Sequence, residues 1–382
     1  MPRVPRPAPA VAEISGALFS RLAPRLAAHR GKLYPLHVGD TWLEPFPGGR
    51  MEDLRIDVHP GMHRYSETQG LPALLDAIVE KLRSQNELPC ERASVLVTAG
   101  ATGALGAAIG MLAAPSEEIL MLAPYWPLIP GIARAFRAIP VDVPFYDRVD
   151  SPEAAVEAVR ERITPRSVAL YVSTPSNPTG RVLPAAWLEA LAELAREQGL
   201  WILSDEVYEA YVYGGRHVSI GRYAPERTLS AFSFSKTYGM AGNRTGYLTG
   251  PPEAITQARK ISTHTFYAAP TPGQLAALRA LQHGDAWVRG TREAYRRAAV
   301  DAAAVLGQEA PEGSCFLFLN VTRHCADGDV FRFLEACLDD GVVLAPGLSC
   351  GRDYAGWVRL CFTSIPPEET AAAVRLLAKR LR

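Results

Sequence analysis

Residues 167–208, "SVALYVSTPSNPTGRVLPAAWLEALAELAREQGLWILSDEVY", contain the pattern that decides the fold of this chain. Two apolar runs, at 167–175 and 200–208, flank an amphipathic segment at 184–199. That segment has a proline near its start and Gly199 at its end, which are typical boundaries of a helix. A strand, a helix and a second strand in this order predict a βαβ unit with parallel strands.

Five further apolar runs surround this unit. They lie at 94–100, 118–125, 139–146, 228–236 and 245–250. Because they are apolar without regular alternation, we expect strands that are covered on both faces. The seven runs together predict an α/β fold, with a large domain over residues 46–284 that contains a mostly parallel seven-stranded sheet and helices on both faces.

The pattern changes after about residue 285. A long helical stretch at 285–308 precedes the apolar run "SCFLFLNV" and, at the end of the chain, the helical pattern "PEETAAAVRLLAKRLR". This α+β texture predicts a smaller C-terminal domain over residues 285–382. Residues 1–45 are expected to form an N-terminal arm and part of the small domain, and the Pro/Ala-rich stretch "MPRVPRPAPAVAEISG", which lacks the apolar core of a signal peptide, is expected to be flexible.

The composition excludes several classes of protein. Of the 382 residues 48% are apolar and 21% charged, as in globular proteins, and the 40 basic side chains are balanced by 40 acidic ones. No net basic field is present to hold nucleic acid or an anionic membrane, and no apolar run approaches the roughly 20 residues of a membrane span. The six cysteines form no CxxC pair, so we expect neither a zinc site nor a disulfide framework, and a cytoplasmic location.

Small and polar residues follow several predicted strands, at the sheet edge where ligands bind in open α/β sheets. "GATGALG" (100–106) leads from a strand into a helix, and its free N–H groups favour a phosphate. "APYWP" (123–127) offers an aromatic ring for stacking, and "STPSNPTG" (173–180) places Asn177 at the sheet edge. Taken singly, these features also fit a tight turn, a packed aromatic residue and an ordinary Pro/Gly loop.

The next two strands carry more specific chemistry. Asp205 ends an apolar strand, where a carboxylate is costly without a partner, and Tyr208 follows three residues later. The alternative for Asp205 is a helix N-cap. Lys236, one of only five lysines, follows the next strand in a constricted setting that disfavours the ammonium form and favours a nucleophile, and Arg244 among glycines suits a phosphate.

A pyridine aldehyde phosphate requires this whole set of groups. A lysine forms an imine with the aldehyde, and a carboxylate keeps the ring nitrogen protonated so that the ring withdraws electrons. The phosphate turn, the stacking aromatic residue, the amide, the phenol and the arginine supply the remaining contacts.

The chain resembles the class I/II aminotransferases, which are fold-type-I pyridoxal-phosphate enzymes. The resemblance extends from about Leu36 to the C-terminal helix and is most specific in "SNPTG", "SDEVY" and "SFSKTYGMAGNRTGY", with "WVRLCFTS" a weaker match. It implies pyridoxal 5'-phosphate as cofactor, amino acids and 2-oxo acids as substrates, and a homodimer with shared active sites.

The resemblance also assigns roles to individual residues. The catalytic set would be Lys236 as the Schiff-base lysine, Asp205 as the partner of the pyridine nitrogen, and Tyr208. The remaining cofactor contacts would be Ala101, Thr102, Ser233 and Arg244 to the phosphate, Trp126 stacked on the ring, Asn177 and Tyr208 at the ring hydroxyl, and Tyr65 in "HRYSETQG" reaching the phosphate of the neighbouring subunit. The substrate would be held by Gly39 in "LHVGDT", by Asn177, and by Arg359 at the α-carboxylate.

Two features depart from that pattern or remain outside it. Some relatives with acidic substrates have a lysine at the position of Thr102. Others bring in an arginine from the neighbouring subunit near the position of His264. The resemblance therefore does not support aspartate or glutamate specificity. His59 and His63 have the i,i+4 spacing of a helical metal site, but without a third ligand we expect a structural or rim position and no metal.

Three functions are compatible with these residues. The first is a biosynthetic or metabolic transaminase acting on an L-amino acid and a 2-oxo acid. The second is another reaction at the same cofactor, such as β-elimination (C–S lyase), decarboxylation, oxidation or cyclisation. The third is a non-enzymatic or nucleotide-binding α/β protein.

Overall fold

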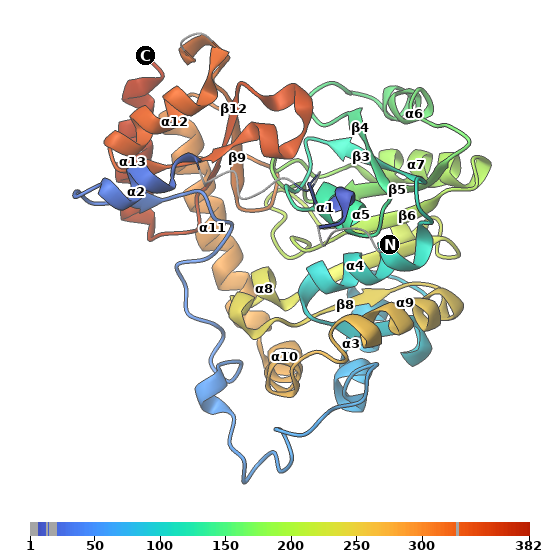
Figure 1. Cartoon of the computed structure of the whole chain (residues 1–382). Coiled ribbons are helices and arrows are strands. Elements are labelled where there is room, and N and C mark those ends of the chain that lie inside the picture. Colours follow the sequence, from blue (N-terminus) through green and yellow to red (C-terminus); the bar gives the residue numbers. More distant parts are fainter. Residues whose placement is uncertain (1–6, 13, 15–20, 326–327) are drawn as a thin grey trace, which may run out of the picture.

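The computed structural model of the chain describes residues 7–12, 14, 21–325 and 328–382 (Figure 1). Most of the arm predicted over residues 1–16 therefore lies outside the described residues. The first two helices along the chain are short: α1 (Pro9–Ala12) and α2 (Ala23–Ala28).

A seven-stranded sheet forms the centre of the larger part of the molecule (Figure 1). Its strand order is β2-β8-β7-β6-β5-β3-β4. The six neighbouring contacts are parallel except for the two made by β8, which is antiparallel to β2 and to β7. All seven predicted strands are confirmed: β2 (Val95–Thr98), β3 (Glu118–Ala123), β4 (Ile139–Pro144), β5 (Ser167–Ser173), β6 (Trp201–Asp205), β7 (Thr228–Ser233) and β8 (Gly246–Thr249).

Helices cover both faces of this sheet, as its apolar strands require. Ile119 and Met121 of β3 pack into one core with α4, α5 and α9, while Leu120 and Leu122 pack into a second core with α6 and α7. A third core joins α3 and α10 to the β2 edge. The helices are α3 (Pro72–Gln85), α4 (Gly100–Leu112), α5 (Ile129–Ala135), α6 (Pro152–Arg160), α7 (Ala185–Glu197), α8 (Phe234–Thr237), α9 (Pro252–Thr265) and α10 (Thr271–His283).

Helix α7 illustrates how the local sequence sets these elements. Pro184 is its N-cap, and Gly199, just past its end, has a φ of +69° that a residue with a side chain adopts only with strain. Trp187, Leu188 and Leu191 on one side of the helix are buried against the sheet. The predicted βαβ unit is therefore confirmed.

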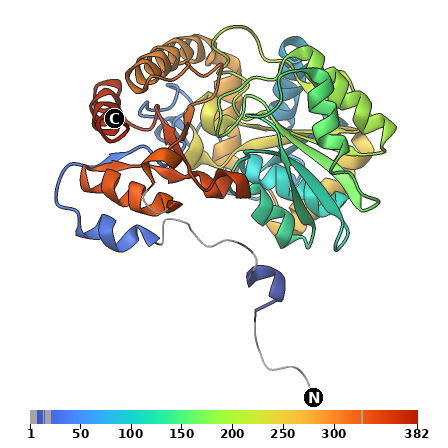
Figure 2. The same ribbon diagram turned by 90° about the horizontal axis from the view of Figure 1, so that it is seen from above.

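A second body of helices and short strands contains the C-terminal part of the chain (Figure 2). Its antiparallel sheet has the order β11-β12-β9, and a separate pair joins β1 to β10 in parallel. Its core includes Leu36 from the N-terminal segment. The elements are β1 (Tyr34–Pro35), α11 (Asp285–Leu306), β9 (Phe316–Asn320), α12 (Val330–Asp339), β10 (Val342–Val343), β11 (Ala345–Pro346), β12 (Trp357–Cys361) and α13 (Pro367–Arg380).

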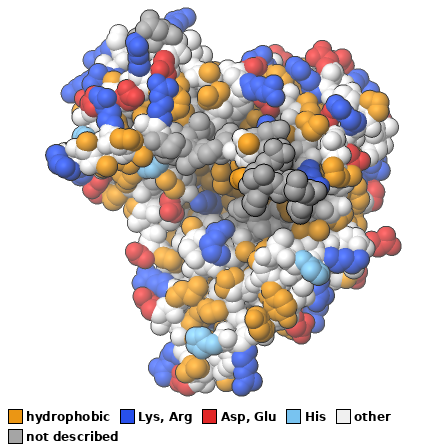
Figure 3. Space-filling view, in the orientation of Figure 1, with side chains coloured by type: hydrophobic (Ala, Val, Ile, Leu, Met, Phe, Trp, Pro, Cys, Tyr) orange, Lys and Arg blue, Asp and Glu red, His pale blue; other side chains and the backbone are white. Residues whose placement is uncertain are grey.

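The surface carries both signs of charge. On the face drawn in Figure 3, basic and acidic side chains are interspersed over both bodies. Among the described residues, no helix combines the length and the apolar character that crossing a membrane requires.

Candidate active site

A cavity of about 170 Å³ lies at the carboxyl ends of the central strands. Its wall is built from the segments that follow β2, β3, β5, β6 and β7, so side chains far apart in the sequence meet there. Nine residues predicted from the sequence line this one cavity: Ala101, Thr102, Trp126, Asn177, Asp205, Tyr208, Ser233, Lys236 and Arg244. Four further lining residues, Leu105, Val207, Ser235 and Ala241, were not predicted.

Lys236 is placed by a short helix at the end of β7. Ser233 caps this helix, α8, by accepting a hydrogen bond from the N–H of Ser235 at 3.0 Å. The hydroxyl of Tyr211 donates to the carbonyl of Lys236 at 2.9 Å and so anchors the backbone from the far side. The Lys236 Nζ donates to the carbonyl of Gly39, so the N-terminal segment reaches the lysine.

Asp205 is a buried carboxylate with two hydrogen-bond donors. The residue is only 6% exposed. The hydroxyl of Tyr171 donates to Oδ2 at 2.7 Å and the N–H of Val207 donates to Oδ1 at 3.3 Å. Residues 207–210 form a turn and not a helix, so Asp205 is not the N-cap of a helix.

Burial sets the pKa values of Asp205 and Tyr171. Removal from water raises the pKa of Asp205 from 3.8 to about 6, although the hydrogen bonds from Tyr171 and Val207 act in the opposite direction. Burial, and then the neighbouring Asp205 charge, raise the pKa of Tyr171 well above its usual value of 10.0. The phenol therefore keeps its proton at neutral pH and remains a donor to the carboxylate.

Arg244 and the start of α4 form a corner suited to an anion. The first N–H groups of a helix lack intrahelical acceptors, and the first turn of α4 holds no acidic side chain that would occupy them. Arg244 Nη1 donates to the carbonyl of Ala241 at 2.9 Å, and this bond fixes the guanidinium near the first turn of α4. A Cβ at Gly100 would lie 2.6 Å from Arg244 Nη2, so a glycine is needed for the arginine to come so close.

Arg359 is a buried cation without an anionic partner. The residue is 8% exposed, and its guanidinium lies 4.4 Å from the centre of the Phe316 ring. It donates from Nη1 to Asn177 Oδ1 at 2.8 Å and from Nη2 to the carbonyl of His37 at 3.0 Å. Within the described chain no carboxylate forms an ion pair with it, and its Nε has no hydrogen-bond partner. A buried charge held only by neutral groups is costly, so this arrangement favours an anionic ligand.

The structure places the remaining predicted residues away from the cavity. Tyr65 is 89% exposed, and its ring contacts that of Tyr267 with centroids 4.9 Å apart. His264 is exposed in the last turn of α9. His59 and His63 lie in consecutive turns, so the helical spacing that suggested a metal site does not apply.

Two contacts of this site had no signal in the sequence. Tyr171 lies inside an apolar strand where nothing marks it as a partner of Asp205, 34 residues away. The apolar run containing Phe316 indicated a strand, but not that its ring would lie against Arg359. The four lining residues that were not predicted all lie inside motifs quoted above, Leu105 in "GATGALG", Val207 in "SDEVY", and Ser235 and Ala241 in "SFSKTYGMAGNRTGY", so their positions were the available signal.

Comparison with known proteins agrees with this geometry. The sequence matches the family described as aminotransferase class I and II over residues 35–377. It is 37% identical to an aspartate/prephenate aminotransferase of Thermus thermophilus, over 82% of each chain, and 30% identical to the arginine–pyruvate transaminase AruH of Pseudomonas aeruginosa, over 84% of each chain. A solved structure of a double mutant of the Thermus thermophilus aspartate aminotransferase superposes with a TM-score of 0.90 at 31% identity, covering 99% of this chain and 100% of that one.

The fold and the cavity thus define a fold-type-I α/β enzyme. The chain belongs to the class I and II aminotransferase family and is an aminotransferase.

Proposed function

We propose that this aminotransferase uses pyridoxal 5'-phosphate to move an amino group between an L-amino acid and a 2-oxo acid, with Lys236 as the covalent anchor. One observation carries the proposal: a lysine amine, a buried carboxylate and an anion-binding corner line the same cavity of about 170 Å³. When bound, the cofactor supplies an aldehyde that reacts with amines and a ring that withdraws electrons.

The phosphate corner fits the cofactor's phosphate group. Ala101 and Thr102 offer N–H groups of the first turn of α4, while Ser233 and Arg244 offer a hydroxyl and a guanidinium. The close approach of Arg244 to Gly100 supports this role, because it aligns the cation with the helix N-terminus.

The remaining cavity residues fit the ring. Asp205 would accept a hydrogen bond from the protonated ring nitrogen, and the donors Tyr171 and Val207 would orient it. Tyr208 and Asn177 would contact the ring hydroxyl. Burial raises the pKa of Tyr208 well above 10.0, so its hydroxyl stays protonated and can donate. Trp126 would pack on the ring face.

Lys236 and Arg359 would act on the substrate. Lys236 Nζ, once free, would take the proton from the substrate α-carbon as a general base. Arg359 would hold the α-carboxylate in two parallel hydrogen bonds, with Asn177 fixing the guanidinium and Gly39 closing the site from the N-terminal segment. These groups fix the orientation of the α-carbon and exclude water from it.

These contacts involve the α-amino and α-carboxylate groups, which all amino acids share. The names of the relatives cover aspartate, prephenate and arginine with pyruvate, which differ in their side chains. Thr102 is neutral and His264 does not line the cavity, so neither position supports aspartate or glutamate specificity for this chain.

We further propose a homodimer with shared active sites. Apolar and aromatic side chains are exposed in the 51–65 segment, Met51, Ile56, Val58 and Tyr65, and Tyr267 lies against Tyr65. Apolar side chains also gather on the lower part of the face in Figure 3. Such a cluster favours a protein interface, from which Tyr65 would reach the phosphate of the partner's cofactor.

The domain bounds and the location are also proposals. The shared core of Leu36 with α11 and α13, and the pairing of β1 with β10, support a small domain of residues 1–45 and 285–382 beside a large domain of residues 46–284. All six cysteines lie in the described part and have free thiols, which fits a reducing cytoplasm.

Absorption spectroscopy of the protein with added cofactor tests the function. We expect a band that borohydride abolishes, with the cofactor then attached to the Lys236 peptide in a mass spectrum. An amino acid should convert the cofactor to its amine form, and a 2-oxo acid should reverse the change. Release of carbon dioxide or ammonia without that cycle would indicate another reaction at the same cofactor, and attachment at a different lysine would refute the role of Lys236.

A further inference from the structure

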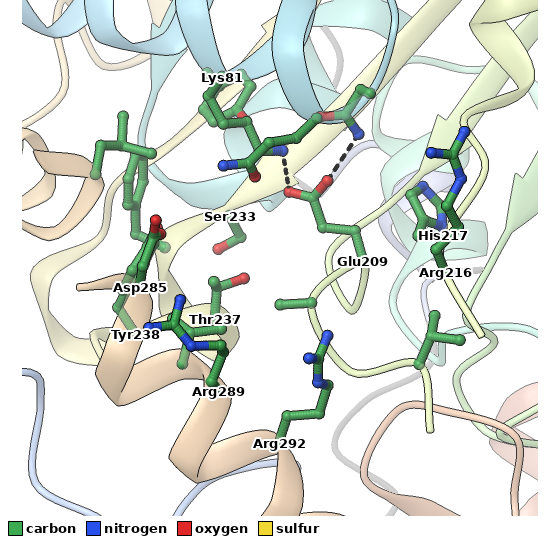
Figure 4. A pocket seen from close by; sticks show the side chains of 18 of the residues that line it. Lys81, Glu209, Arg216, His217, Ser233, Thr237, Tyr238, Asp285, Arg289 and Arg292 are labelled. Atoms are coloured by element: carbon green, nitrogen blue, oxygen red, sulfur yellow. Dashed lines mark hydrogen bonds and ion pairs between the residues drawn. The ribbon is translucent and has the colours of Figure 1, made fainter. Parts of the chain in front are cut away.

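A second cavity, larger than the first at about 340 Å³, lies beside the helix that carries Lys236 (Figure 4). Phe234 and Thr237 of helix α8, together with Tyr238 just past its end, form one wall, and Ser233 lines both cavities. The other walls come mainly from α3, α11 and the segment that follows β6, with one residue each from β8 and α10. Its volume lies in the range of small-molecule sites, which is roughly 300–1,000 Å³.

Two arginines that face this cavity lack partners. Arg289 and Arg292 extend from α11 opposite Lys81 and Glu209 in Figure 4. Three residues apart on a helix, they lie on the same side of it. In the described part of the chain neither of them forms an ion pair or a hydrogen bond, whereas Arg296, further along the same helix, is bound to Glu293.

The other charges of the cavity are mostly satisfied. Glu209 accepts hydrogen bonds from Lys81 and from Asn86 Nδ2, the latter at 2.8 Å, and so cannot also neutralise the arginines. Arg216 pairs with Glu87 outside the cavity wall. Asp285 is the remaining carboxylate of the wall. Once the pairs Lys81–Glu209 and Arg216–Glu87 are set aside, Arg289 and Arg292 face the single carboxylate of Asp285, so the cavity keeps a net positive charge.

We propose that this cavity binds a small organic polyanion, with Arg289 and Arg292 each holding an acidic group of the ligand. A guanidinium binds carboxylates and phosphates with two parallel hydrogen bonds, which matches either kind of acidic group. The bound anion would contact Thr237 and Tyr238, which directly follow Lys236. Because the same ligand would bridge α8 and the long helix α11, its binding changes the reaction at Lys236.

Calorimetric titration of the cofactor-loaded protein tests the site, with citrate and inorganic phosphate as probes for the two kinds of acidic group. We expect at least one probe to bind with a Kd below about 1 mM. The Arg289→Gln/Arg292→Gln double variant should weaken that binding by 10-fold or more, since each arginine contributes a charge-assisted hydrogen bond. The matched control, Arg296→Gln/Arg297→Gln, removes the same charge from the same helix and should leave binding unchanged.

Two further measurements separate this site from the active site. Binding of the probe should persist when an amino acid substrate saturates the first cavity, and the probe should change the KM or kcat for that substrate by about 5-fold in the wild type but not in the Arg289/Arg292 variant. The proposed site would be rejected if saturating substrate abolished binding of the probe. It would also be rejected if both double variants weakened that binding equally. Binding without any kinetic effect would overturn the coupling through α8.

Discussion

Replacing Asp205 by asparagine should stabilise the cofactor-free protein at neutral pH while removing its activity. The carboxylate is buried at the end of β6, and its pKa is raised from 3.8 to about 6. A shift of about 2 units corresponds to about 3 kcal/mol, since each unit is worth about 1.4 kcal/mol. Asparagine has the same shape and no charge to bury, and its oxygen can still accept the hydrogen bond from Tyr171. Its Nδ2 cannot accept the longer hydrogen bond from the N–H of Val207, so about 3 kcal/mol is the upper bound of the gain.

The sign of the pH dependence follows from proton binding. Between pH 4 and pH 6 the folded protein holds a proton on Asp205 that the unfolded chain has released. This contribution to stability is therefore fully present below about pH 4 and is lost as the pH rises through about 6. At pH 7.5 the variant should gain up to about 3 kcal/mol over the wild type, and at pH 4.5 much less.

Urea unfolding of both cofactor-free proteins at pH 4.5 and pH 7.5 measures this difference. Asp339→Asn is the matched control, because the hydrogen-bonded Arg25 lowers the pKa of that exposed carboxyl. Replacing this carboxyl should therefore not increase the free energy of unfolding at pH 7.5. Equal changes in unfolding free energy for the wild type and Asp205→Asn between the two pH values would refute the reasoning. With cofactor added, the same Asp205→Asn protein should lose several orders of magnitude in turnover, because a neutral amide does not hold the ring nitrogen protonated.

Three other variants test separate parts of the site. Tyr171→Phe removes a donor from the Asp205 carboxylate at 2.7 Å, so the pKa of Asp205 should rise further above 6, as followed by NMR of labelled cofactor-free protein; an unchanged pKa would contradict the contact. Arg359→Lys should lower kcat/KM for an amino acid by about 10- to 100-fold, the value of a charged hydrogen bond, and hardly affect the matching amine without a carboxylate; equal losses would reject the carboxylate role. Mixing Lys236→Ala with a Tyr65→Phe protein should restore part of the activity through hybrid dimers, and light scattering that gives a monomer at assay concentration would disprove the shared site.

Strand direction made the meeting of Asn177, Asp205 and Lys236 predictable, whereas the family resemblance supplied individual residues such as Trp126 and Ser233. In a mostly parallel sheet the carboxyl ends of the strands lie at one edge, so residues that follow successive strands are neighbours. Asn177, Asp205 and Lys236 each lie at the end of a strand or a few residues beyond it, and each lines the cavity. The glycine-rich turn at 100–106 could likewise be placed at a helix start from its sequence alone.

The partners of these residues could not be predicted in the same way. Tyr171 is one of several apolar or aromatic residues in β5, and the face on which its hydroxyl lies depends on how β5 pairs with β6. The unpaired state of Arg289 and Arg292 depends on which side chains α3 and the segment after β6 bring opposite them. Such contacts have no periodicity along the chain.

The sequence by itself determined the order and type of the elements, because helix and strand patterns and their terminating glycines and prolines are local properties. Only the tertiary structure decided the strand order, with β8 inserted antiparallel between β2 and β7, and the contact of Arg359 with Asn177 across 182 residues. These depend on how buried faces pack together, and packing joins segments by shape and by the need to satisfy buried charge rather than by their distance along the chain.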